Sequence, residues 1–115
     1  MEYLSENVIT KDYVASNRQI IEKFYSVQFA IDGRAPLYQF RIKNIPPDGP
    51  GILVGEKSAV LSRLNVGDEL DMTYCPCGAA AVSKELRTKV MRVDHHTEGR
   101  FEGHVAIGLS VVEQS

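Results

Sequence analysis

Six short strand-like segments, most of which alternate apolar and polar residues, constrain the fold of this chain more than any other feature. Alternation with a period of two is typical of a β-strand that buries one face. Turn residues such as Asp32-Gly33 and Asn65-Val66-Gly67-Asp68 separate the segments. Many short strands at close spacing predict an antiparallel barrel or sandwich. The expected strands are Val27–Ile31, Leu37–Lys43, Gly51–Val54, Glu69–Tyr74, Leu86–Val93 and Phe101–Val112.

Two further segments are expected to be helical. Ser16-Asn17-Arg18-Gln19 fits a capping box, and apolar residues follow it at helical spacing, which predicts a short helix over about Asn17–Tyr25. Ser58–Leu64 is a candidate for a single helical turn. The residues before the capping box have no clear period. We therefore interpret 1–15 as an N-terminal tail and 16–115 as one domain of the mainly β class.

Size and composition narrow the classes of function. The 115 residues, 43% apolar and 24% charged, fit a single globular domain with its own core. A net charge of −2 argues against a partner that is a nucleic-acid polymer, although a local basic patch can still bind a small anion. No apolar run reaches the roughly 18 residues of a membrane helix, and the acidic N-terminus lacks the apolar core of a secretory signal. We expect a cytoplasmic protein without a transmembrane segment.

The segment Phe40–Val54 joins two strand-like stretches through a loop that is rich in proline and glycine. Its prolines exclude a helix interior or a central strand. On the residues alone, Asn44 and Asp48 can hydrogen-bond their own backbone in a turn, and the glycines can supply an unusual backbone angle or a close approach to a strand. The loop consists of Asn44, Ile45, Pro46, Pro47, Asp48, Gly49, Pro50 and Gly51.

The stretch Asn44-Ile45-Pro46-Pro47-Asp48-Gly49 resembles the D/N-x-S-x-x-G signature of PilZ domains, the bacterial receptors for cyclic di-GMP, with proline in place of the serine. Leu61–Leu70 resembles the family's L-x-x-L-x-V-G-D-x-L segment, and Val105–Val111 resembles its closing strand. The resemblance covers about Arg18–Glu113. It implies a six-stranded antiparallel PilZ-like β-barrel with one or two short helices.

The resemblance also implies a ligand. In ligand-binding PilZ domains, an R-x-x-x-R motif before the first strand holds the phosphates and guanine edges of cyclic di-GMP, because a guanidinium forms paired hydrogen bonds with both. Here the region reads Arg18-Gln19-Ile20-Ile21-Glu22-Lys23, which lacks that motif, and the two cations in it can equally be solvated charges on a helix. The residues expected to bind the ligand are Arg18, Lys23, Arg41, Asn44, Asp48 and Gly49, with Lys43 as an electrostatic helper.

Two functions follow from the resemblance. One is a signalling domain that binds cyclic di-GMP and relays it to a protein partner, in regulation of the motility or biofilm type. The other is a PilZ-like protein-interaction module that no longer binds the ligand. A third alternative is an unrelated six-stranded barrel that binds an oligonucleotide or another small ligand on Tyr38 and Phe40. The known nucleophile, phosphate-loop and metalloprotease motifs do not occur in the sequence, so we expect a non-enzyme without a cofactor.

Two groups of potential metal ligands receive a structural interpretation. Cys75-Pro76-Cys77 has C-x-C spacing, whereas structural zinc sites commonly use C-x₂₋₄-C with a second pair of ligands, so we expect two free thiols at a strand end. His95-His96 is interpreted as a solvated loop before the Thr97–Arg100 turn, and His104 can face either side of the last strand.

Strict alternation in the expected strand Leu86–Val93 predicts which side chains share a face. It places Leu86, Thr88, Val90 and Arg92 on one face and Arg87, Lys89, Met91 and Val93 on the other.

Overall fold

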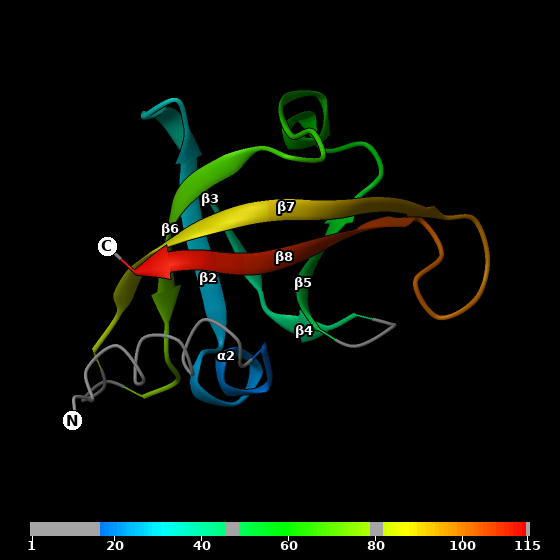
Figure 1. The fold of residues 1–115 in the computed structure, drawn as a ribbon. Helices are drawn as coiled ribbons and strands as arrows, with labels where there is room; N and C mark the ends of the chain where they lie inside the picture. The colour runs from blue at the N-terminus through cyan, green and yellow to red at the C-terminus, as the bar shows by residue number, and fades with distance from the viewer. Residues whose placement is uncertain (1–16, 46–48, 79–81, 115) are drawn as a thin grey trace.

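A computed structural model of the chain describes residues 17–45, 49–78 and 82–114 (Figure 1). These residues form one short α-helix, one 3₁₀ helix and seven β-strands, so the protein is mainly β, as predicted. Neither of the described helices is long and apolar enough to span a membrane. The elements are α2 (Asn17–Lys23), β2 (Ser26–Ile31), β3 (Arg34–Arg41), β4 (Lys43–Asn44), β5 (Pro50–Gly55), η1 (Ala59–Arg63), β6 (Glu69–Cys75), β7 (Lys84–His96) and β8 (His104–Gln114).

All described strands belong to one sheet with the order β3-β2-β6-β7-β8-β5-β4, and every neighbouring pair is antiparallel. The sheet curls on itself into a half-barrel (Figure 1). Its hydrogen-bonded ladder does not close, because β3 and β4 are its two edges. The structure therefore supports an antiparallel curled sheet, whereas the closed six-stranded barrel is not observed.

The strand count exceeds the prediction because the expected strand Leu37–Lys43 is divided at Ile42. The buried Ile42 donates its backbone N–H to the carbonyl oxygen of Tyr25 at 2.9 Å, outside either ladder. The part before Ile42 pairs with β2, and the part after it pairs with β5. The two edges of the described sheet are thus one residue apart in the chain, and seven strands replace the six that we expected.

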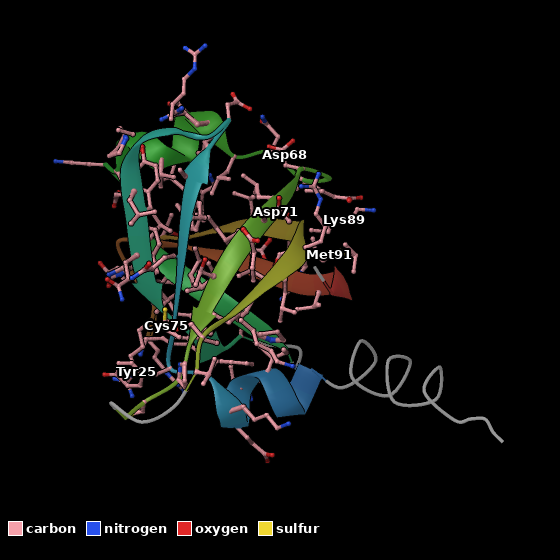
Figure 2. The ribbon with its side chains drawn as sticks, turned by 90° about the vertical axis from the view of Figure 1, so that its left-hand side faces the viewer. Tyr25, Asp68, Asp71, Cys75, Lys89 and Met91 are labelled. Atoms are coloured by element: carbon pink, nitrogen blue, oxygen red, sulfur yellow. The ribbon has the colours of Figure 1, made fainter. Side chains whose placement is uncertain are left out.

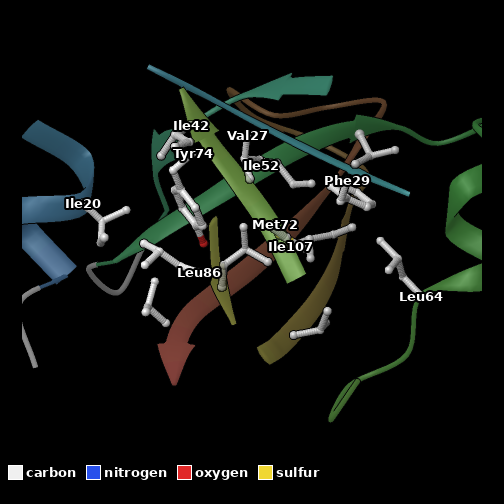
Figure 3. Close-up of a cluster of buried hydrophobic side chains, with 14 of the residues drawn as sticks. Ile20, Val27, Phe29, Ile42, Ile52, Leu64, Met72, Tyr74, Leu86 and Ile107 are labelled. Atoms are coloured by element: carbon white, nitrogen blue, oxygen red, sulfur yellow. The ribbon is translucent and has the colours of Figure 1, made fainter. Parts of the chain in front are cut away.

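The apolar faces of the strands meet inside the curl, and a helical segment covers each end of this core. Ile20 of α2 and Phe24, the residue after α2, enter one end, where the Phe24 ring lies edge-on to Tyr74 with centroids 5.6 Å apart. Leu64, which follows η1, lies at the opposite end of the cluster from Ile20 (Figure 3). Burying a large apolar side chain contributes about 1.5–3 kcal/mol, so the helix is held by its packing.

The predicted turns are confirmed. Asp32 and Gly33 both have positive φ, 58° and 69°, as a two-residue hairpin between β2 and β3 requires. The backbone N–H of Asn65 donates to Asp68 Oδ2 at 2.9 Å, and the N–H of Asp68 donates to the Asn65 carbonyl at 3.0 Å. Ser58 caps η1 by accepting a hydrogen bond from the N–H of Val60. The positions of these turns could therefore be predicted from their residues.

The facing predicted for the second half of β7 is wrong. Val90 pairs with Leu109 and Arg92 pairs with Gly108, so Met91 is the extra residue of a β-bulge. One extra residue reverses the alternation. Arg92 therefore leaves the face of the buried Val90 and turns outward, whereas Val93 packs against the core.

The end of β7 also differs from the prediction. The strand continues to His96, so His95 and His96 are paired strand residues and not a solvated loop. The last strand begins at His104, three residues later than expected, because residues 101–103 belong to the turn.

Candidate functional site

The loop after β4 is closed by the side chain of Asn44. Its Oδ1 accepts a hydrogen bond from the backbone N–H of Gly49 at 3.0 Å, and the N–H of Ile45 donates to the Gly49 carbonyl at 2.8 Å. The structure thus brings together the first and last residues of the predicted ligand loop, in the turn-forming role that either residue can have without a ligand. Asp48 lies outside the described residues.

Gly51 allows Ile45 to pack against β5. The side chain of Ile45 is buried against Gly51. A Cβ atom on Gly51 would lie 2.5 Å from Ile45 Cγ1 and 2.6 Å from the carbonyl oxygen of Ile107. Since no real Cβ tolerates such contacts, the close approach requires glycine at this position.

Four residues form one row across β4, β5, β8 and β7. Residues that pair across strands share a face. Neighbouring strands lie about 4.8 Å apart, so the two ends of the row are separated by about 14 Å. The row runs Lys43, Gly51, Gly108 and Arg92. It lies on the outer face of the curled sheet, and it places a cation on either side of two residues without side chains.

Arg92 lies across the second glycine of the row. Its Nε is 3.4 Å from the position that a Cβ atom on Gly108 would occupy, and its Nη1 forms an ion pair with Asp94 Oδ2 at 3.5 Å. The Arg92 side chain retains 39% of its exposure, so the guanidinium is accessible from the outer face. Sequence reasoning missed this residue, because strict alternation placed it toward the core.

Arg41 lies just before the kink that leads into β4. Its guanidinium carbon is 4.8 Å from the centroid of the half-exposed Tyr25 ring, a cation–π contact. Tyr25 lies beside the end of β6, where its N–H donates to the Cys75 carbonyl (Figure 2). Arg41 and Lys43 flank the buried Ile42, so both project from the outer side.

The two predicted ligand residues of the helix are less closely tied to the loop. Lys23 is an exposed residue in the last turn of α2, two residues before Tyr25. Arg18 belongs to the first turn of α2, and its side chain lies outside the described part of the structure. Ile20 of the helix and Phe24, the residue that follows it, are buried in the core. Among the described residues, none of Lys23, Arg41 and Lys43 forms an ion pair.

A hollow of about 520 Å³ lies on the outer face of β2, β6 and β7. Unlike the row that contains Lys43 and Arg92, it has charged side chains that are mainly acidic. Among the described residues that line it, Arg87 is the one cation, and it pairs with Glu69 at 3.5 Å and with Asp71 at 3.2 Å. The hydrogen bond that Arg87 donates to the Asp71 carboxylate raises the pKa of Arg87, so the guanidinium stays charged. Asp32 and Glu85 add two further carboxylates, which disfavours an anionic ligand in this hollow.

The sequence also singled out an aromatic pair, Tyr38 and Phe40, and the two cysteines, Cys75 and Cys77. Tyr38 and Phe40 are half-buried and pack on Phe29, with ring centroids 5.7 and 6.1 Å apart, so they do not form an exposed stacking platform. Cys75 is half-buried and Cys77 is exposed, and both are free thiols.

The chain was compared with protein-family models, with curated proteins and with solved structures, and none of the three comparisons found a match. The resemblance to PilZ domains therefore stays a prediction.

Proposed function

We propose that this chain is a non-catalytic, PilZ-like signalling domain that binds cyclic di-GMP on the outer face of β4, β5, β8 and β7 and relays the binding to a protein partner. The observation that carries the proposal is the row of Lys43, Gly51, Gly108 and Arg92. Asn44 and Ile45, which begin the loop that resembles the PilZ signature, lie beside this row.

The chemistry of the row suits a dianionic cyclic dinucleotide. Lys43 can approach a phosphate as a point charge, and Arg92 can form paired hydrogen bonds with a phosphate or with guanine O6 and N7. The two glycines between the cations are covered, Gly51 by Ile45 and Gly108 by Arg92, so a ligand on this face would contact the cationic side chains and not the glycine backbone. Arg41, stacked on Tyr25, adds positive charge and a planar surface beside Lys43.

The proposed fold is a PilZ-like barrel. The edges β3 and β4 are connected through Ile42 alone, so the bent segment 34–44 contacts β2 on one side and β5 on the other. Counted as one strand, this segment would close six strands into a barrel. The signature-like loop then follows the second strand of that barrel.

A PilZ-like interaction module without ligand is the second candidate, and the geometry of Asn44 favours it. The Asn44 carboxamide oxygen already accepts a hydrogen bond from Gly49. In the sequence register that begins at Arg18, Glu22 stands where the R-x-x-x-R motif would have an arginine. A carboxylate at that position would repel a phosphate.

Calorimetric titration with cyclic di-GMP distinguishes the two candidates. The native chain is compared with Lys43→Ala, Arg92→Ala and Arg18→Ala, and with Arg34→Ala as the matched control, because Arg34 is exposed at the far end of β3. We expect binding that weakens with salt, that falls at least about tenfold in Lys43→Ala and Arg92→Ala, and that survives in Arg34→Ala.

Three results would change the assignment. Equal binding by the native chain and the Lys43 and Arg92 variants would remove the row from the site. Loss of cyclic di-GMP binding in Arg18→Ala alone would place the binding site at the helix α2 instead. No heat at any ligand concentration, together with unshifted amide resonances, would favour the interaction module.

A further inference from the structure

The far end of the β7–β8 hairpin holds a second, chemically different hollow of about 290 Å³. It is independent of the row proposed to bind cyclic di-GMP. Three histidines and two glutamates line it, namely His95, His96, His104, Glu56 and Glu102. Thr97 and Gly103 complete the lining. All three histidines of the chain therefore gather at one end of the sheet.

His96 and His104 are direct cross-strand partners on β7 and β8. Direct partners share a face, and their Cβ atoms lie about 4.5–5.5 Å apart. Two imidazoles at that spacing can reach the same ion from one side of the sheet. His95 pairs with the buried Val105, so alternation places its side chain on the opposite face.

The surroundings of His104 leave one ring nitrogen suitable for a metal. Its Nδ1 lies 3.1 Å from the backbone carbonyl oxygen of Glu102. A carbonyl oxygen only accepts hydrogen bonds, so this contact places a proton on Nδ1 and directs the Nε2 lone pair away from Glu102. Metal-bound histidines commonly have this outer hydrogen bond, which fixes the tautomer and the ring. The ring of His96 is oriented by an edge-on contact with Phe101, with centroids 5.4 Å apart.

Glu56, which lines the same hollow, is a candidate for a third ligand. Its backbone N–H donates to the carbonyl oxygen of Gly103 at 3.1 Å, and its Oε1 lies 3.9 Å from the position of a Cβ atom on Gly103. The N–H of Gly103 in turn donates to the carbonyl of His96 at 3.1 Å. As the side chains stand, no group of three His, Cys, Asp or Glu residues within the described ranges is arranged to hold a metal ion. A third ligand would therefore require a rotation of Glu56.

We infer that His96 and His104 form a two-histidine chelate for a divalent transition-metal ion such as Zn²⁺, with water or Glu56 completing the coordination. Neutral imidazole suits Zn²⁺, Ni²⁺ and Cu²⁺, whereas Mg²⁺ prefers oxygen ligands. Binding crosslinks the ends of β7 and β8 beside the turn 97–103.

The test is a titration of the full-length chain with ZnCl₂, followed by calorimetry and by amide NMR. The Cys75→Ser/Cys77→Ser chain is titrated in parallel, because free thiols bind the same ion. In that background His96→Asn and His104→Asn each remove one proposed ligand. His95→Asn is the matched control, because it removes a neighbouring histidine from the opposite face. MgCl₂ is the control for nonspecific attraction of a divalent cation.

We expect Zn²⁺ binding that persists without the two thiols, shifts the amides around His96 and His104, and weakens at least about tenfold in His96→Asn and in His104→Asn. His95→Asn should bind like its parent, and Mg²⁺ should cause no shift at these amides. Binding that disappears with the thiols, that persists in both His96→Asn and His104→Asn, or that is lost in His95→Asn would overturn the inference. So would the absence of any Zn²⁺ binding.

Discussion

Gly51 lies directly opposite Gly108 on the adjacent strands β5 and β8, and a side chain from another part of the fold covers each of them. Ile45 covers Gly51, and Arg92 covers Gly108. The same pair of small residues thus lets the Ile45 side chain pack down on Gly51 and lets the Arg92 guanidinium lie across Gly108. Packing and the proposed binding surface depend on this one relationship.

Replacing Gly51 by alanine should destabilise the domain. The added methyl group would meet the Ile107 carbonyl, which is held in the β5–β8 ladder, so the backbone must shift. We expect a loss of about 1–3 kcal/mol in the free energy of unfolding, measured in urea. Gly55→Ala is the matched control on the same strand, because no atom lies within 4 Å of its added Cβ, and it should change stability by less than about 0.5 kcal/mol. Equal effects at both positions would contradict the packing described here.

The β-bulge at Met91 predicts which of two neighbouring residues tolerates a polar side chain. Val93→Asp should destabilise the domain, because Val93 packs against the core and a carboxylate there would lose its hydration. Arg92→Gln should be far milder, because Arg92 faces outward. The thermal unfolding midpoints of the two variants provide the comparison. Strict alternation would give the opposite order, and that result would mean that the bulge is misplaced.

A buried hydroxyl pair predicts a third effect. Tyr74 Oη lies 2.8 Å from Thr88 Oγ1, and Thr88 Oγ1 donates to the Leu86 carbonyl, so the phenol must donate to Thr88. Tyr74→Phe removes that bond in the core and should cost about 1–2 kcal/mol of unfolding free energy, measured in urea. Tyr38→Phe is the control, because its half-buried hydroxyl lies a long 3.4 Å from Arg63 Nη1. An unchanged stability of Tyr74→Phe would show that the buried pair is not formed.

Most of the fold could be predicted from the sequence because it depends on local chemistry. Alternation located the strands, and Asp32-Gly33 set a hairpin that needs two positive φ angles. The division of one strand at Ile42 could not be predicted in this way. It depends on a hydrogen bond to Tyr25, which only the folded chain brings close.

The candidate site was harder to predict for the same reason. Asn44 and Gly49 could be selected from a local motif, but Arg92 joins the row only after a bulge reverses the alternation of β7. A bulge is decided by pairing with β8, and β7 alone contains no signal for it. The pairing of His96 with His104 depends on the same long-range register.

The proposed binding surface is tested most directly by an amide NMR titration of the full chain with cyclic di-GMP. We predict that the shifts gather along the row, at Lys43, Gly51, Gly108 and Arg92, with further shifts at Asn44 and Gly49. The acidic hollow around Glu69 and Arg87 should remain unchanged and serves as the internal reference. No shifts at saturating ligand, or shifts that gather at the hollow while the row stays silent, would contradict the account.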